Sequence, residues 1–210
     1  MGKNLSPKCK QCRRTDEKLF LKGDRCSSAK CAMVKRNYPP GFHGPRGRRQ
    51  RLSDYGLQLN EKQKAKKQYN MLEKQFKLTF EKAKQKSGNT GDNFLKLLET
   101  RLDNTIYRLG FADSRPQARQ LINHGLFSVN DTRVDIPSYQ VKIGDVIKIK
   151  SNKKNVKIFT NLAERIQKKE IPGWMDFDNK TMKGKILHQP DTQAIKSNFN
   201  MQMVVEFYSR

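Results

Sequence analysis

All four cysteines of the chain lie between residues 9 and 31, and they constrain how its first part folds. Cys9, Cys12, Cys26 and Cys31 have the spacing C-x2-C-x13-C-x4-C. A C-x2-C pair brings two thiolates to one ion from a tight turn, and a second pair completes a tetrahedral zinc site. No apolar secretory signal is found at the N-terminus, so we expect a reducing compartment where disulfides rarely persist. Structural zinc is the favoured interpretation, with free thiols and disulfides as alternatives.

The chain carries a large excess of positive charge. It has 44 Lys and Arg against 20 Asp and Glu in 210 residues, a formal net charge of +24. Such a charge indicates a polyanionic partner, either nucleic acid or an anionic membrane. No apolar run approaches the roughly 20 residues that span a bilayer, and the positive charge is spread along the whole chain. Nucleic acid is therefore the expected partner and a membrane is not.

A dense arginine run follows a segment rich in proline and glycine. Pro39, Pro40 and Gly41 exclude a helix there, and the planar guanidinium group suits phosphate because it bonds two oxygens at once. We predict an extended arm on an RNA backbone, with a solvated linker as the alternative. The predicted contacts are Arg46, Arg48, Arg49, Arg51 and the neighbouring Tyr55.

The apolar pattern then predicts helices followed by strands. One long helix is expected from Asn60 to the break at 87–91, and a second from Asp92 to Gly110, because apolar residues recur at steps of three and four. A short helix from Ser114, with Pro116 in its first turn, ends at Gly125. Strands are expected around 127–129, 134–136, 141–143 and 146–149, with a turn at Asn130 and Asp131 after the first. A helix over 161–169, irregular chain from 171 and a last strand over 203–210 are expected to follow.

The short helix from Ser114 carries the central predicted RNA-binding site. Basic side chains and the free N–H groups of a helix N-terminus can converge on a phosphate. Two arginines seven residues apart on the preceding helix share one face and extend the same surface. The predicted contacts of this site are Arg101, Arg108, Ser114, Arg115, Arg119, Gln120, Asn123 and His124, of which Arg115, Arg119, Gln120, Asn123 and His124 are expected to be exposed on the short helix.

The sequence from 98 to 147, beginning "LETRLDNTIYRLGFADSRPQARQLINHG", closely resembles the small RNA-binding module named after ribosomal protein S-four. The flanking stretches "RRQRLSDYGLQLN" (48–60) and "IPGWMDFD" (171–178) and the end of the chain resemble the ribosomal protein S-four family itself, in order and over nearly the whole length. The four cysteines match the zinc-bearing form of that family.

The resemblance implies an α+β fold: a mostly helical first domain with an N-terminal zinc-binding segment, into which the module of helices and a twisted sheet is inserted. The domains implied are a zinc segment (1–45), a helical rRNA-binding domain (46–97, completed by 171–210), the RNA-binding module (98–160), and a C-terminal helix and strand on the first domain (161–210).

The resemblance also implies a function. The chain is expected to be a structural constituent of the small ribosomal subunit, a primary rRNA binder that starts assembly of the subunit body and contributes to accuracy near the mRNA entrance. Neighbouring ribosomal proteins, rRNA and mRNA are the implied partners, in a cytoplasmic or an organellar ribosome. An enzyme is not expected, because paired acid and base groups and a large catalytic domain are missing from the sequence. A zinc-finger regulator of DNA is the other alternative, although a base-reading helix does not follow Cys31.

Overall fold

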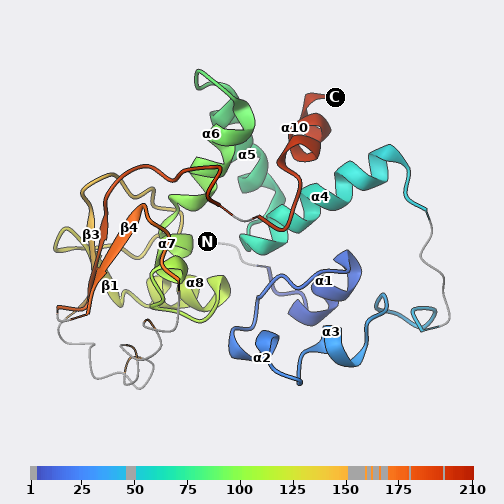
Figure 1. Cartoon of the computed structure of the whole chain (residues 1–210), viewed down its shortest axis with the longest axis horizontal. Coiled ribbons are helices and arrows are strands. Elements are labelled where there is room, and N and C mark those ends of the chain that lie inside the picture. The colour runs from blue at the N-terminus through green and yellow to red at the C-terminus, as the bar shows by residue number, and fades with distance from the viewer. Residues whose placement is uncertain are drawn as a thin grey trace. The chain divides into compact units, whose positions relative to one another are not determined.

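The computed structural model describes residues 4–45, 51–150, 159, 162, 166, 170–179, 181–195 and 197–210 (Figure 1). The chain divides into two compact units. The first consists of Met1–Phe94 with Lys196–Arg210, and the second of Leu95–Ile195. Helices and an antiparallel sheet together confirm the expected α+β class.

The first unit begins with three short helices, α1 (Lys8–Thr15), α2 (Asp24–Ser27) and α3 (Ala32–Lys35). A small apolar cluster joins them, in which Cys12, Leu19 and Leu21 are buried and Met33 packs against them. This cluster is too small to stabilise a polar segment of about 40 residues by burial alone.

The long helix expected from Asn60 is two helices, α4 (Asp54–Gln68) and α5 (Glu73–Lys84). The expected start is wrong because Ser53 caps the helix earlier, accepting a hydrogen bond from the backbone N–H of Gly56. The expected continuity is wrong because Asn70 adopts a left-handed conformation with φ of 52°. Asparagine tolerates that region better than most residues, so the chain turns there.

The last residues form a helix, α10 (Met201–Ser209), where a strand was expected. The side chain of Asn200 caps it by accepting a hydrogen bond from the N–H of Met203. Val204 is buried, and α10 lies beside α4 (Figure 1). The β-branched pair at 204 and 205 suggested a strand, but the cap and this packing override that weak preference.

Aromatic residues form the core of the first unit. The ring of Phe94 meets those of Phe76 and Phe80 edge to face, with centroids 5.0 and 5.4 Å apart. Tyr208 of α10 stacks on Phe80 with centroids 4.8 Å apart. Such pairs add to the free energy gained from burial. The end of the chain thereby completes the core of the unit that the start of the chain builds.

The second unit contains α6 (Thr90–Glu99), α7 (Leu102–Arg108) and α8 (Arg115–Asn123), although the unit boundary falls within α6. The single helix expected from Asp92 to Gly110 is interrupted at Thr100 and Arg101. There the N–H of Leu102 bonds the carbonyl of Tyr139, and the N–H of Val141 bonds that of Thr100. These hydrogen bonds compete with helix continuation, and the apolar periodicity does not reveal them.

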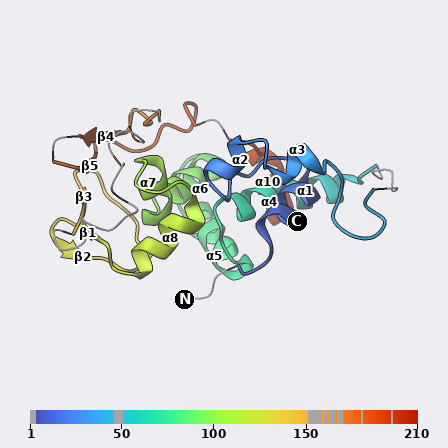
Figure 2. The same ribbon diagram turned by 90° about the horizontal axis from the view of Figure 1, so that it is seen from below.

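In the part of the chain that the structure describes, the sheet has five antiparallel strands in the order β2-β1-β3-β5-β4 (Figure 2). β1 (Phe127–Val129) and β2 (Thr132–Arg133) are joined by Asn130 and Asp131, whose φ values of 47° and 67° match a type I′ turn. β3 (Val146–Ile149) agrees with the expected strand. The strands expected around 134–136 and 141–143 do not form.

The segment after Glu170 was expected to be irregular and to complete the first domain. It instead supplies β4 (Met175–Asp178) and β5 (Lys183–Ile186) to the sheet, and residues up to 195 belong to the second unit. Glycine at position 184 lets β5 pack against Leu109, because a Cβ atom at 184 would lie only 2.5 Å from Cδ1 of Leu109. The expected helix over 161–169 falls largely outside the described residues; Leu162 and Ile166 within it are helical and buried.

Candidate nucleic-acid interface

Helix α8 begins and ends as the sequence predicts. Ser114 accepts a hydrogen bond from the N–H of Gln117, and the side chain of Gln117 accepts one from the N–H of Asp113 at 2.6 Å. Pro116 lies in the first turn. Gly125, with φ of 64°, follows the last turn. The capping pattern therefore fixes the position of the side chains along this helix.

The expectation that Arg115 and Arg119 are exposed is wrong. Gln120, Asn123 and His124 are exposed, but Arg115 and Arg119 are only 5% and 7% exposed. These two side chains point into the protein because α7 carries hydrogen-bond acceptors for them. Periodicity alone assigns any charged residue to solvent, and it does not detect a partner on another helix.

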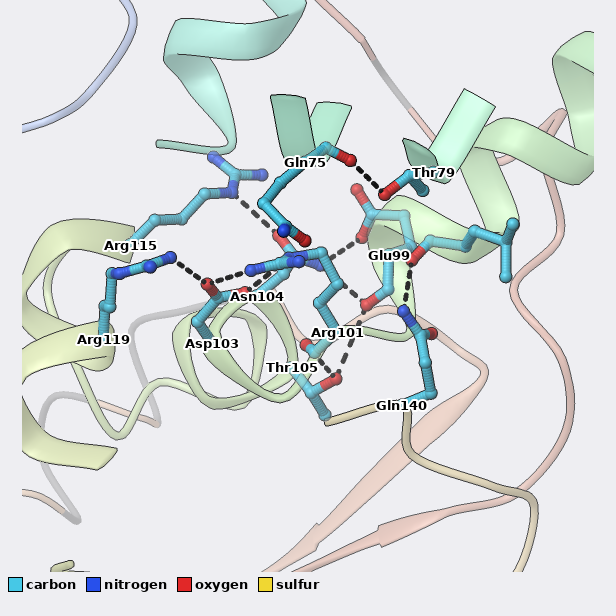
Figure 3. Close-up of polar contacts among 11 residues, drawn as sticks. Gln75, Thr79, Glu99, Arg101, Asp103, Asn104, Thr105, Arg115, Arg119 and Gln140 are labelled. Carbon is cyan, nitrogen blue, oxygen red and sulfur yellow. Dashed lines mark hydrogen bonds and ion pairs between the residues drawn. The ribbon is translucent and has the colours of Figure 1, made fainter. Parts of the chain in front are cut away.

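Asp103 binds two of the predicted arginines (Figure 3). Arg101 donates two hydrogen bonds to it, from Nε at 3.1 Å and from Nη2 at 2.8 Å. Nη1 of Arg119 lies 3.5 Å from the same carboxylate. Burial lowers the pKa of Arg119, Asp103 raises it and Arg101 lowers it again, with a net lowering, yet an arginine stays protonated in proteins.

Glu99 and Asn104 bind the other two arginines. Glu99 is fully buried, and its carboxylate accepts hydrogen bonds from Nε and Nη2 of Arg108 at 3.1 and 2.9 Å. Asn104 donates to Glu99 at 2.8 Å and accepts from Nε of Arg115 at 2.8 Å. The guanidinium carbon of Arg115 also lies 4.6 Å from the ring centroid of Tyr107. We call this group the arginine cluster: Glu99, Arg101, Asp103, Asn104, Arg108, Arg115 and Arg119.

Asp103 binds Arg101 and Arg119, Glu99 binds Arg108, and Arg115 bonds the amide of Asn104. These contacts fix the guanidinium groups in place, and the net positive charge of the chain attracts an anion. Sequence reasoning missed both acids and Asn104. The only signal for them is the proximity of Glu99 and Asp103 to Arg101 in the chain.

Of the predicted arginine arm, the structure describes only the C-terminal end, from Arg51 onward. Arg46, Arg48 and Arg49 lie outside the described residues, whereas Arg51 and Tyr55 are exposed. The Tyr55 ring lies 5.7 Å from that of Phe207, between centroids, and the guanidinium carbon of Arg210 lies 5.9 Å from the Tyr55 ring. Tyr55 is thus oriented by α10 while half of its surface remains accessible.

The four cysteines line one small cavity of ≈ 20 Å³ in the first unit. All four are free thiols, and the backbone N–H of Lys22 donates to Sγ of Cys26 at 3.4 Å. Burial and the nearby sulfurs raise the pKa of the Cys12 thiol, although a backbone hydrogen bond from Leu19 opposes them. As the side chains are placed, no group of three or more His, Cys, Asp or Glu residues in the described ranges is arranged to hold a metal ion.

A membrane-spanning helix is not found either: within the described ranges, every helix is too short or too polar to cross a bilayer.

Two family models together cover residues 3–147. The model described as "Ribosomal protein S4/S9 N-terminal domain" matches residues 3–99, and the model described as "S4 domain" matches residues 100–147. The second match contains almost all of the arginine cluster and the whole of α8.

Relatives match the entire chain. "Small ribosomal subunit protein uS4" of Syntrophomonas wolfei is 50% identical over 210 residues, covering 100% of both chains. The protein of the same name from Thermus thermophilus is 49% identical with the same coverage. Two family models and full-length relatives agree, and the chain belongs to the uS4 family of small ribosomal subunit proteins.

Proposed function

We propose that this chain is a structural constituent of the small ribosomal subunit that binds rRNA directly. The observation that carries the proposal is the match to the uS4 family over the full length, with the RNA-binding module coinciding with the arginine cluster. The net charge of +24 agrees with a partner as anionic as rRNA. As a member of this family the chain is a structural protein and not an enzyme.

The RNA surface that we propose has two parts. In the second unit, Gln120, Asn123 and His124 are exposed on α8 and contact RNA directly. Among the predicted arginine contacts, Arg108 keeps 24% of its side chain exposed and reaches RNA directly, whereas Arg101, Arg115 and Arg119 are buried and contribute through their positive charge. In the first unit, the arginine arm and Tyr55 form the other part. Ser114 acts by starting α8.

A structural zinc ion held by Cys9, Cys12, Cys26 and Cys31 is also part of the proposal. The supporting observations are that all four thiols border one cavity and that none is in a disulfide. The cavity of ≈ 20 Å³ is close to the space of about one water-sized sphere, so it suits a single ion. Four thiolates leave no open coordination position, and zinc bound there would stabilise the fold of residues 4–45 without catalysing a reaction.

We further propose the place of the chain in the subunit. As a primary rRNA binder it starts assembly of the subunit body, contacts neighbouring small-subunit proteins, and contributes to accuracy beside the mRNA entrance. The ribosome concerned is the cytoplasmic one, with an organellar ribosome as the alternative. These finer roles rest on the family resemblance.

Co-sedimentation tests the function. The chain should migrate with small ribosomal subunits and remain on them through a high-salt wash. Purified small-subunit rRNA should bind it in competition with duplex DNA, and the logarithm of affinity should fall by about 0.7–0.9 for each phosphate contact per decade of salt. Failure to bind rRNA, or preference for duplex DNA, would overturn the proposal.

A further inference from the structure

A second, much larger cavity lies beside α1 in the first unit. Its volume is ≈ 430 Å³, within the range of sites that hold small organic ligands. The lining residues come from the N-terminal segment, α1, the loop at Pro40 and Gly41, and the end of α4. None of the predicted RNA contacts borders it. The charged members are Lys10, Arg14 and Lys67.

Helix geometry places the cavity and the cysteines on different faces of α1. Lys10 and Arg14 are four residues apart and therefore project from the same face. Cys9 and Cys12 are three residues apart and line the small cysteine cavity instead. Lys67, near the end of α4, completes the basic side of the larger cavity. The helix that carries half of the thiols also carries two of the three cations.

The lining of the larger cavity has three cations and no carboxylate. Neighbouring lysines of α4 differ in this respect, since Lys62 and Lys66 each bind Glu73, and Lys64 binds Glu17 and Glu61. Over the described residues, the side chains of Lys10, Arg14 and Lys67 make neither a hydrogen bond nor an ion pair. Burial and the charges of Arg14 and Lys66 lower the pKa of Lys67.

Neutral polar groups complete the lining. Asn4, Ser6 and Gln11 contribute amide and hydroxyl groups, and the buried Gln11 is held by Asn4 and by the carbonyl of Ser6, each at 3.3 Å. Clustered cations with neutral donors suit a phosphate group. The volume also leaves room for the sugar and base attached to that phosphate.

We propose that this cavity binds one nucleotide of the rRNA, with its phosphate on Arg14 and Lys67. The inference rests on the proposed function and deepens it, because it names a specific pocket in the first unit as an RNA contact. Like cations that repel one another become favourable neighbours once a phosphate lies between them. The phosphate of a free nucleotide has the same chemistry, and the experiment separates the two sources.

The first experiment measures binding of the full chain to small-subunit rRNA over a range of salt. Combined replacement of Arg14→Gln and Lys67→Gln should lower the slope of log affinity against log salt by about 0.7–0.9, which corresponds to the one phosphate that the two side chains share. The matched control replaces Lys82→Gln and Lys84→Gln, two exposed residues of α5. If both double variants change the slope equally while the wild type binds, the pocket is wrong and the proposed function stands. If the wild type does not bind rRNA, both fail.

The second experiment uses the wild-type chain and therefore does not depend on how the variants fold. Amine-reactive labelling followed by mass spectrometry should show that rRNA protects Lys67 more than Lys82. Uridine monophosphate and inorganic phosphate are tested separately at the same concentration of phosphate groups. Equal labelling of Lys67 with and without rRNA would overturn the proposal. Protection by the mononucleotide but not by rRNA would assign the cavity to a free nucleotide and overturn it as well.

Discussion

Arg101 and Asp103 form a two-pronged ion pair in which both side chains are at most 5% exposed. Arg119 from α8 approaches the same carboxylate. A buried charge that loses its partner keeps its full desolvation cost, so this single acid holds two basic side chains in place. The RNA-binding module thus depends on a residue that has no direct RNA contact in our proposal.

Replacing Asp103→Asn should lower the free energy of unfolding by about 3–5 kcal/mol, since it removes the buried carboxylate that pairs with Arg101 and lies beside Arg119. Urea denaturation of the full chain measures the change. Asp135→Asn is the matched control, because Asp135 is 52% exposed and lies 3.5 Å from Arg133, a geometry worth at most about 1 kcal/mol. Equal losses for the two variants would contradict the role of Asp103.

Acid should destabilise the first unit through Glu73. Burial alone would raise the pKa of Glu73, but hydrogen bonds from Lys62, Lys66 and Tyr208 outweigh it and lower the pKa to about 2. A lowered pKa means that the stabilisation is complete above the ordinary value of 4.5 and is lost as the pH falls toward 2. The free energy of unfolding should therefore fall over this window in the wild type and less steeply in Glu73→Gln.

The control for that prediction is Glu81→Gln, an exposed residue of the same helix. It should retain the acid dependence of the wild type. Parallel pH curves for Glu73→Gln and the wild type would show that the three hydrogen bonds do not stabilise the fold. Tyr208 gives a second readout, because burial and the charge of Glu73 raise its pKa and keep it neutral well above pH 10. Its ultraviolet titration should shift downward in Glu73→Gln.

Local signals in the sequence were sufficient to predict where α8 begins and ends. Ser114, Pro116, Gln117 and Gly125 are adjacent in the chain and each acts through nearby backbone, so their pattern predicts the start and end of the helix. The turn residues Asn130 and Asp131 were also recognisable in the sequence, although the type of turn was not. The family resemblance added the α+β class and the function, which periodicity alone leaves open.

Tertiary interactions explain what the sequence did not reveal. The interruption at Arg101 depends on hydrogen bonds with residues near 140, and the inward turn of Arg115 depends on Asn104. β4 and β5 form because β3 offers an edge and Gly184 admits Leu109. These partners are far apart in the chain, so local patterns in a single sequence do not reveal that they interact.

Gly184 is tested by replacing it with alanine. The added Cβ atom would meet the side chain of Leu109, and overpacking of this kind typically costs about 1–3 kcal/mol of unfolding free energy. Leu109→Ala in the same chain should remove the clash, so the double variant should lose less than the sum of the two single losses. Gly173→Ala is the control, since a Cβ atom there meets no atom within 4 Å. Strict additivity at 184 and 109 would refute the contact.

We predict that zinc bound to the four cysteines, rather than the small apolar cluster, stabilises the fold of residues 4–45. Zinc measured by mass spectrometry should be close to one ion per chain in the wild type and much lower in Cys9→Ser. Limited proteolysis should then cut the first 45 residues, whereas the sheet of the second unit stays protected. Wild-type protein treated with a chelator should give the digestion pattern of Cys9→Ser. The chelator should leave the digestion pattern of Cys9→Ser itself unchanged. Because a four-thiolate site contributes folding free energy directly, an unchanged digestion pattern in both cases would disprove the zinc proposal.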